Sequence, residues 1–399
     1  MKLPANRPLP WLGAVLALGF IIALATKSVE AIQDERSVAE LTGQMKPVCV
    51  GRLLIDLPEG ARHELSQPRI DGFNIATFDE TPAAFKARVD ERLAQIIRTP
   101  AKPGQGSNLE LARAVKNRHG VAGQVFVHGR TVAPAQSSKG ANPKRLRPEA
   151  VVIEALVHGN GVSVDFTAEL ADPDAVGQLS TLIARLVPNP KNVLPFESGF
   201  CMDKAYIRGP QAPGPDEQIV LAATLSGRPE IAFTLLHSGG TGADRSGLLN
   251  RSTGLNARTA SDAGAPVSIV LARLRSIGGL AGAEVVEQYG EKNHAAVYRF
   301  WWEANGSKDK LPVPRVALTM FTGGGAQGTV LPALSQGIAY GLWDKVATTV
   351  RLHANDNAND STKDKIARRP QADSNSSALA RAACTGSGSS PCAAPSSRS

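Results

Sequence analysis

Apolar residues recur at every third or fourth position in three stretches of the chain, which is the spacing of an amphipathic helix. Thr81 is a residue type that caps helices, Pro82 suits a first turn, and Pro100 ends the first stretch. Each predicted helix carries its apolar residues on one side, so each must pack on another element. The three helices are predicted over residues 81–99, 172–187 and 335–350.

Runs rich in Val, Ile, Tyr, Phe and Trp predict strands, which supply the surface on which these helices pack. Between the first two runs, Asn160-Gly161 provides the positive backbone angles of a tight hairpin. The strand runs do not alternate strictly with the helices, so the pattern favours an α+β fold with antiparallel sheets. The runs cover residues 150–156, 162–167, 283–289, 295–302 and 315–321.

Prolines crowd residues 188–215 and predict a boundary between two domains. We expect an N-terminal α+β domain over residues 45–190 and a C-terminal one over residues 191–353, each an antiparallel sheet packed with amphipathic helices. After Leu352 the chain is dominated by Asn, Asp, Ser, Ala and Gly and has almost no large apolar residue. Residues 354–399 cannot bury enough surface to offset chain entropy, which predicts a disordered tail.

The first residues have the three-part layout of an export signal. Two basic residues precede an apolar stretch over residues 11–25, and small residues suited to cleavage end at Ala25 and at Ala31. About fifteen apolar residues are few for a membrane-spanning helix, which needs about 20. We expect residues 1–31 to be a cleaved signal peptide, with a retained membrane anchor as the alternative. Both interpretations place the body of the protein outside the cytoplasm.

The composition is that of a folded protein with an uneven charge distribution. Hydrophobic residues make up 42% of the chain, charged residues make up 20%, and the formal net charge is +8. Much of the positive excess lies between Lys102 and Arg147, where it could attract nucleic acid, anionic lipid or an acidic partner. We favour a solvated face and a mobile loop over residues 133–148. Aromatic residues are only 5%, and this stretch has no RNP-like or zinc-finger pattern, so nucleic acid is not an expected partner.

The four cysteines favour pairing in an oxidising compartment, although four cysteines allow three connectivities. We favour Cys49 with Cys201, which flank one domain, and Cys384 with Cys392, which are close together in the tail. Free thiols buried in the body are the alternative. No Cys-x-x-Cys motif is present, so the sequence does not support a redox enzyme or a zinc ribbon.

The motifs of common enzymes are missing from the sequence. It has no Gly-x-Ser-x-Gly elbow, His-Glu-x-x-His pair, Walker loop or dinucleotide fingerprint, and no two of its seven histidines have metal-ligand spacing. Glycine-rich segments at residues 238–242 and 322–325 could present amides to an anion. Neither has the helix and lysine of a phosphate cradle, so we interpret both as mobile loops. We therefore expect no catalytic residue, no cofactor and no metal.

An ordered set of short motifs between about Cys49 and Leu352 is similar to one protein family, although no single motif is diagnostic. The motifs are Cys49–Pro58, Gly199-Phe200-Cys201, Leu248–Arg251, Gly279–Glu284, Phe300–Glu303, and Leu342-Trp343-Asp344 ahead of Arg351-Leu352. Taken in this order, they resemble the immunity proteins that neutralise phospholipase effectors of the bacterial type VI secretion system.

The resemblance implies a periplasmic, two-domain α+β protein that clamps a toxic lipase and keeps the active site of the lipase from lipid. Such inhibition needs no catalytic residue. The resemblance also implies a disulfide between Cys49 and Cys201 and packing roles for Trp301, Trp302 and Trp343. The partner would be a cognate type VI lipase effector. Separately, an N-terminal segment retained as an anchor would keep the protein near the membrane.

Contacts in inhibitors usually lie on variable loops, so we expect the partner-binding residues in three loops. They are His237, Gly240 and Gly242 in segment 237–242, Gly324 in segment 323–328, and Lys144 and Arg145 in the basic loop 133–148. Two other functions stay open. One is an envelope protein that binds lipid or glycan, and the other is a hydrolase whose triad is dispersed along the chain.

Overall fold

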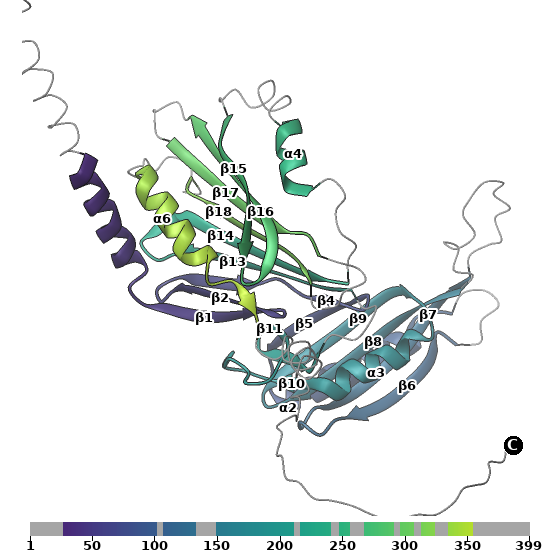
Figure 1. The fold of residues 1–399 in the computed structure, drawn as a ribbon. Coiled ribbons are helices and arrows are strands. Elements are labelled where there is room, and N and C mark those ends of the chain that lie inside the picture. The colour runs from purple at the N-terminus through teal and green to yellow at the C-terminus, as the bar shows by residue number, and fades with distance from the viewer. Residues whose placement is uncertain are drawn as a thin grey trace, which may run out of the picture. The chain divides into compact units, whose positions relative to one another are not determined.

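The computed structural model describes residues 27–101, 107–132, 149–210, 216–240, 247–255, 267–290, 296–306, 313–323 and 334–353. The predicted tail over residues 354–399, the apolar stretch over residues 11–25 and the basic loop 133–148 lie outside these ranges. Within them the chain is mostly β-sheet with few helices (Figure 1). None of the described helices is both long and apolar enough to cross a membrane.

The helices and strands follow one another along the chain in two halves. Residues 27–41 form a first helix. The strands up to residue 208 are β1 (Met45–Val50), β2 (Leu53–Pro58), β3 (Arg62–Leu65), β4 (Arg69–Ile70), β5 (Phe73–Asp79), β6 (Leu109–Lys116), β7 (Ala122–Val132), β8 (Glu149–Gly159), β9 (Val162–Ala171), β10 (Leu186–Pro188), β11 (Gly199–Met202) and β12 (Ala205–Arg208). The later strands are β13 (Glu217–Leu225), β14 (Arg228–Gly239), β15 (Val267–Ile277), β16 (Leu280–Gly290), β17 (Ala296–Ala304), β18 (Arg315–Phe321) and β19 (Arg351–Leu352). The remaining helices are α2 (Pro82–Arg98), α3 (Ala175–Arg185), α4 (Gly247–Leu255) and α6 (Gln336–Ala347).

One large antiparallel sheet runs through both halves in the order β15-β16-β17-β18-β14-β13-β4-β5-β9-β8-β7-β6. The short strand β4 makes the link, because it pairs with β13 on one side and with β5 on the other. Two three-stranded sheets accompany the large one, β1-β2-β19 and β10-β12-β11. The antiparallel sheets are as predicted. The expectation of one separate sheet in each half differs from this continuous sheet, since a two-residue strand is too short to leave a pattern in the sequence.

The three predicted helices are confirmed, and a side chain caps the start of two of them. The Thr81 side chain accepts a hydrogen bond from the Ala84 amide (3.2 Å), and Ser335 accepts one from the Ile338 amide (3.1 Å). Helix α3 begins three residues later than expected, because Asp172 forms a turn in which its side chain accepts from the Asp174 amide. The polar side chains thus decide where these helices begin.

The hairpin predicted at Asn160-Gly161 joins β8 to β9, and both residues have positive φ angles, 51° and 77°. Helices α2 and α3 pack on opposite faces of this part of the sheet. Leu156 contacts the α2 cluster, whereas its neighbour Val157 belongs to the main core that receives α3. Successive residues of a strand point to opposite faces of the sheet, so β8 packs against α2 on one face and against α3 on the other.

In the C-terminal half the same alternation places α4 and α6 on opposite faces of the sheet. Trp301 packs in a small cluster with Leu248 of α4, while Phe300 and Trp302 face the main core and α6. The Phe300 ring stacks on Trp343 at 5.4 Å between centroids. The tryptophans therefore have the packing roles that the family resemblance implied.

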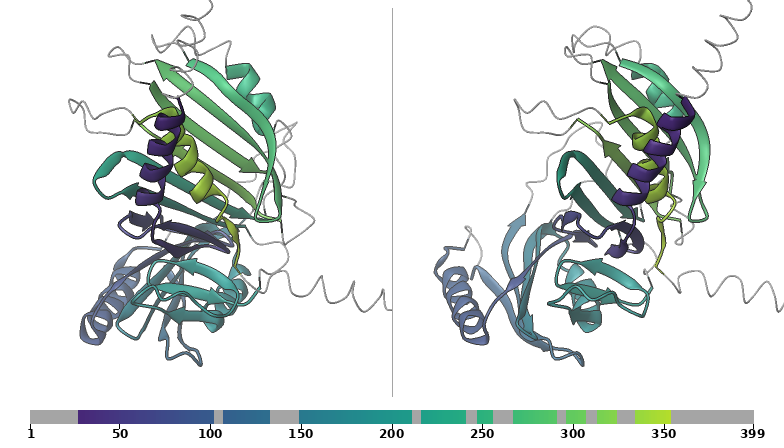
Figure 2. Two further views of the ribbon diagram at one scale, coloured as in Figure 1. Left: turned by 60° about the vertical axis from the view of Figure 1, so that its left-hand side comes forward. Right: turned by 90° about the vertical axis from the view of Figure 1, so that its left-hand side faces the viewer.

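The helix of residues 27–41 packs against α6, and both views in Figure 2 show the two side by side. The Ser335 hydroxyl donates to Asp34 (2.7 Å), and a side chain at Gly341 would collide with Val38. The same helix includes residues 27–31, the end of the segment predicted as a signal or anchor.

Candidate partner-binding site

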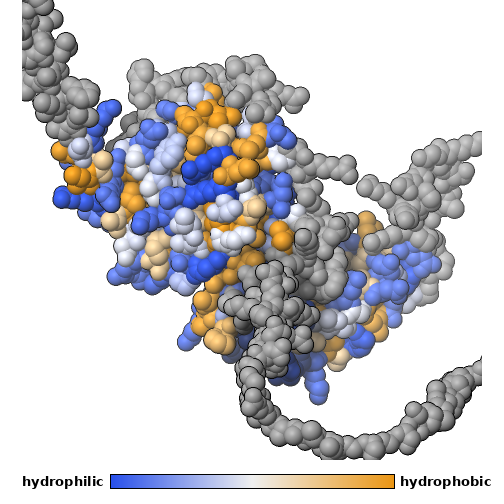
Figure 3. Space-filling view, viewed as in Figure 1, coloured by the Kyte–Doolittle hydropathy of each residue, from blue (hydrophilic) through white to orange (hydrophobic). Residues whose placement is uncertain are grey.

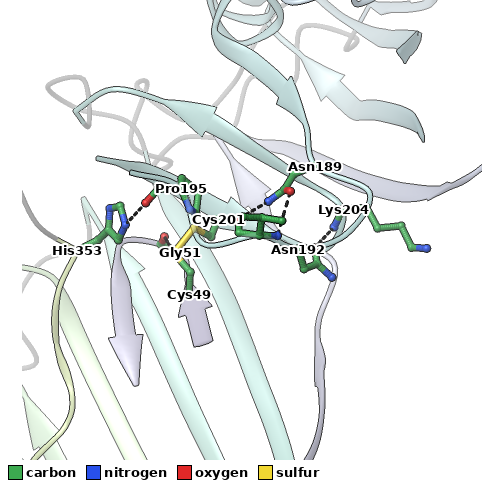
Figure 4. The surroundings of a disulfide bond; sticks show 9 residues. Cys49, Gly51, Asn189, Asn192, Pro195, Cys201, Lys204 and His353 are labelled. Atoms are coloured by element: carbon green, nitrogen blue, oxygen red, sulfur yellow. Dashed lines mark hydrogen bonds between the residues drawn. A yellow bond between two sulfur atoms is a disulfide. The ribbon is translucent and has the colours of Figure 1, made fainter. Parts of the chain in front are cut away.

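A disulfide joins Cys49, near the end of β1, to Cys201 in β11, 152 residues later (Figure 4). Beside it the backbones of Gly51 and Cys201 exchange two hydrogen bonds, of 3.0 and 2.8 Å. Gly51 has a φ of 58°, and a Cβ at this position would lie 2.8 Å from the His237 ring. Only glycine fits this close approach between the two halves. The predicted pairing of Cys49 with Cys201 is confirmed, and such a bond is typical of proteins outside the cytoplasm.

Next to the disulfide, Arg52 and Glu217 form a buried ion pair with two hydrogen bonds, Nε to Oε2 at 2.6 Å and Nη2 to Oε1 at 2.7 Å. Both side chains are only 5% exposed. The remaining Arg52 nitrogen donates to the Gly209 carbonyl at 2.9 Å. Burial raises the pKa of nearby Asp71 to about 6, with help from Glu217 and Asp216 and against the opposing effect of Arg185. These charges belong to the framework that joins the two halves.

The loop that connects β10 to β11 lies over this framework, and we call residues 189–198 the junction loop. The Asn189 side chain both donates to the Val193 carbonyl (2.7 Å) and accepts from the Val193 amide (3.0 Å). Asn192 donates to the Asp203 carboxylate (2.8 Å) and accepts from the Lys204 amide (2.6 Å). The loop is therefore held at its start by side chains that replace backbone pairing.

The second part of the junction loop is held as well (Figure 4). His353, just after β19, contacts the Pro195 carbonyl through Nε2 at 2.9 Å. The Ser198 carbonyl accepts from the Gly209 amide (2.8 Å), and Glu197 forms an ion pair with Arg208. Residues from β19 and from both sides of β12 thus fix one irregular segment.

Despite these restraints, the junction loop exposes large apolar side chains. Phe196 is 94% exposed, Val193 is 62% exposed and Leu194 is 40% exposed. Figure 3 shows apolar surface beside β10 and β11 in the view of Figure 1. Elsewhere in the described ranges no three exposed large apolar residues fall within four positions. Consecutive exposed apolar residues on a fixed loop are typical of binding surfaces.

A groove of about 500 Å³ borders the loop. Its walls come from β1, β3, the junction loop and the turn between β11 and β12, and they carry both apolar and charged side chains. The residues that contribute are Lys46–Cys49, His63–Leu65, Asn189, Lys191–Pro195, Cys201–Asp203 and Ala205. A groove beside an exposed aromatic residue can receive a segment of another protein.

Of the six sequence-predicted contact residues, the structure describes His237 and Gly240. His237 is fully buried, with its ring edge-on to Phe200, and burial with help from Arg52 lowers its pKa to about 3. This is a core position, so His237 cannot touch a partner in this structure. Gly240 directly follows β14 and has a left-handed conformation, with a φ of 72°. Gly242, Gly324, Lys144 and Arg145 lie outside the described residues, as do Cys384 and Cys392.

Sequence reasoning missed the junction loop because its prolines indicated a linker. A usable signal was the run Val193-Leu194-Pro195-Phe196 between asparagines and charged residues, since a mere linker has no need of large apolar side chains. No group of three or more histidine, cysteine or acidic residues in the described ranges is placed to hold a metal ion. The junction loop and its groove thus provide an exposed apolar surface and a concave surface that can bind another protein.

Two family profiles match the chain over most of the described region. The profile of the Tle cognate immunity protein 4 N-terminal domain matches residues 46–175, and that of the C-terminal domain matches residues 193–355. No curated protein matches the chain.

Solved structures with the same fold include the immunity protein TplEi of the type VI secretion system from Pseudomonas aeruginosa. Its apo form is 23% identical, with a TM-score of 0.61 over 78% of this chain and 99% of that chain. Its complex with "L" peptide is 23% identical, with a TM-score of 0.59 over 77% and 98%. A crystal structure of a Tle4–Tli4 complex contains a chain that is 23% identical, with a TM-score of 0.61 over 77% and 97%. The two profile matches cover both halves around the disulfide and the junction loop, and the chain belongs to the Tle cognate immunity protein 4 (Tli4) family.

Proposed function

We propose that this protein binds a Tle4-type phospholipase effector of a type VI secretion system and neutralises it in the periplasm. The observation that carries the proposal is the match of both family domains, in order, over residues 46–175 and 193–355. The solved Tle4–Tli4 complex contains a chain of the same fold, which supports a protein partner of this kind.

The mechanism we infer is occlusion of the active site of the lipase by a stoichiometric complex. A large sheet and a disulfide between distant segments provide a rigid body, and rigidity lowers the entropy lost on binding. Inhibition by coverage leaves the chemistry to the effector, so this chain needs only a complementary surface. The disulfide is also compatible with the oxidising periplasm, where a secreted phospholipase would meet its lipid.

The test is to purify the protein together with a Tle4-type lipase. Size-exclusion chromatography with light scattering should give a one-to-one complex, and phospholipid hydrolysis should stop near an equimolar ratio. Undiminished hydrolysis at that ratio, without a complex, would refute the proposal. Cell fractionation checks the location, because a protein found in the cytoplasm could not protect the periplasm.

A further inference from the structure

The exposed apolar residues of the junction loop have no use within the described part of the fold. An apolar side chain gains about 25 cal/mol for each Å² that it buries, and Phe196 leaves almost all of its surface in water. Aromatic residues such as phenylalanine bury roughly 150–250 Å² when they are covered. The fold therefore leaves a large apolar area available to a partner.

The loop is also ready to bind without rearrangement. Asn189 and Asn192 fix its first half, while His353 and the Glu197–Arg208 pair fix its second half. Ordering a free loop on binding costs entropy, and a loop that is already ordered avoids most of that cost. An aromatic side chain on an ordered loop can serve as the anchor of an interface, because a partner's pocket would remove its surface from water.

The charges around the loop favour a protein partner over an anionic membrane. Lys46 pairs with Glu59, Lys204 pairs with Asp79, and Arg208 pairs with Glu197. A loop that binds anionic lipid headgroups would have cations free to meet them. Three nearby cations are thus neutralised, whereas Lys191, the cation of the loop itself, has no salt bridge among the described residues.

We propose that Val193, Leu194 and Phe196 insert into the apolar surface on which the phospholipase binds the acyl chains of its substrate. This inference rests on the proposed function, and it names the surface that the inhibitor uses. A phospholipase must present apolar surface to take up acyl chains, and three fixed apolar side chains have the matching chemistry. The inhibitor then competes with lipid directly.

The experiment compares Phe196→Ala with a matched control, Leu274→Ser. Leu274 is a 79% exposed apolar residue on β15, so its loss should affect folding as little as that of Phe196. We expect Phe196→Ala to raise the Kd for the lipase at least tenfold, with a parallel loss of inhibition, and Leu274→Ser to leave both unchanged. Equal melting temperatures of the three proteins exclude a folding effect, and a Val193→Ser variant provides a second measurement.

The outcomes separate the two proposals. If the wild-type protein forms no complex with the lipase, the proposed function and this inference both fail. If the wild-type protein inhibits and the Phe196→Ala and Val193→Ser variants inhibit equally well, only the inference fails. A short-chain, non-hydrolysable phospholipid should weaken the wild-type complex, and an unchanged Kd would refute the assignment to the acyl-binding surface. Phe196-dependent binding to phosphatidylglycerol vesicles, with unaltered lipase affinity, would assign the loop to the membrane instead.

Discussion

Arg52 and Glu217 lie 165 positions apart in the sequence and form a buried ion pair with two hydrogen bonds. Arg52 lies in the turn between β1 and β2, and Glu217 is the first residue of β13. The pair therefore connects the N-terminal hairpin to the large sheet. A buried ion pair contributes little net stability when complete, but losing one partner leaves a charge without compensation.

Replacement of Glu217 by leucine should destabilise the fold by about 3–5 kcal/mol, because Arg52 would stay buried without its partner. The double variant Arg52→Met/Glu217→Leu should recover much of this loss, since no buried charge remains. Urea denaturation measures both effects. The control is Asp90→Ala, which breaks the exposed Lys86–Asp90 pair on α2 and should change little. A single variant as stable as the wild type would contradict the prediction.

Removal of the disulfide by Cys49→Ser/Cys201→Ser should lower the free energy of unfolding by about 2–5 kcal/mol, because the bond closes a long loop in the unfolded chain. Denaturation of the wild-type protein with a reducing agent should give the same midpoint as the variant without it. If the reductant lowers the midpoint of the double variant as well, a further bond contributes to stability.

His237 should make the stability of the protein depend on pH. Its pKa is about 3 in the folded chain against an ordinary 6.5, so the unfolded state takes up the proton first as pH falls. Stability is therefore present above pH 6.5 and lost as pH falls below that value. In His237→Leu this decrease should be shallower, and stability at pH 7 should change little, because the described structure gives the ring nitrogens no hydrogen-bond partner. An unchanged slope between pH 6.5 and 4 would count against this account.

Asp71 should have the opposite effect. Its pKa is raised from 3.8 to about 6, so the folded state holds the proton more tightly than the unfolded state. Stability from this group falls as pH rises through that window, since the charged carboxylate is disfavoured by burial and by Glu217. Asp71→Asn should therefore gain stability relative to the wild type at pH 7 and show no such gain at pH 3. Asparagine tolerates the positive φ of 54° at this position, which keeps the comparison fair.

The packing of the first helix on α6 predicts a local effect. A Cβ at Gly337 would lie 2.0 Å from an Asp34 oxygen, and one at Gly341 would lie 2.7 Å from a Val38 methyl carbon. Gly341→Ala should loosen residues 27–41 without unfolding the sheet, which faster amide hydrogen exchange of those residues would reveal. The control is Gly177→Ala in α3, where an added Cβ meets nothing within 4 Å. That change should stabilise the protein by about 0.5–1 kcal/mol. Unaltered exchange in Gly341→Ala would show that the contact is not close.

The elements that could be predicted from sequence are those whose pattern is local. The three helices, the strands β8, β9 and β16 to β18 and the Asn160-Gly161 turn follow from spacing and turn chemistry within about a dozen residues. Strand β6 was not predicted from the sequence. It is an edge strand that is only partly buried, and its arginine and lysine side chains are typical of a solvent-exposed segment. The continuity of the sheet depends on β4, whose two residues carry no periodicity.

The candidate site was less predictable because its residues, like β4, are positioned by contacts that leave no local pattern in the sequence. His237 lies near the end of β14, where the sequence turns polar, yet distant segments that include Gly51 and Phe200 enclose it. Phe196 occupies a segment rich in prolines, and only the hydrogen bonds of Asn189, Asn192 and His353 show that it is fixed. The burial of His237 and the placement of the loop depend in part on contacts across more than a hundred positions, Gly51 with His237 and Pro195 with His353, which a single sequence does not display.

The small sheet β1-β2-β19 has a consequence for the order of synthesis. The Asp56 amide donates to the Thr349 hydroxyl at 2.9 Å, across 293 positions, and β19 pairs with β2. The β1-β2 hairpin is synthesised early, but its third strand, β19, becomes available only after nearly all of the described chain has left the ribosome. Such distant pairings form slowly. A chain that closes late has not completed its fold when synthesis ends, so under the export proposed above, the delay in folding would favour passage through a membrane channel.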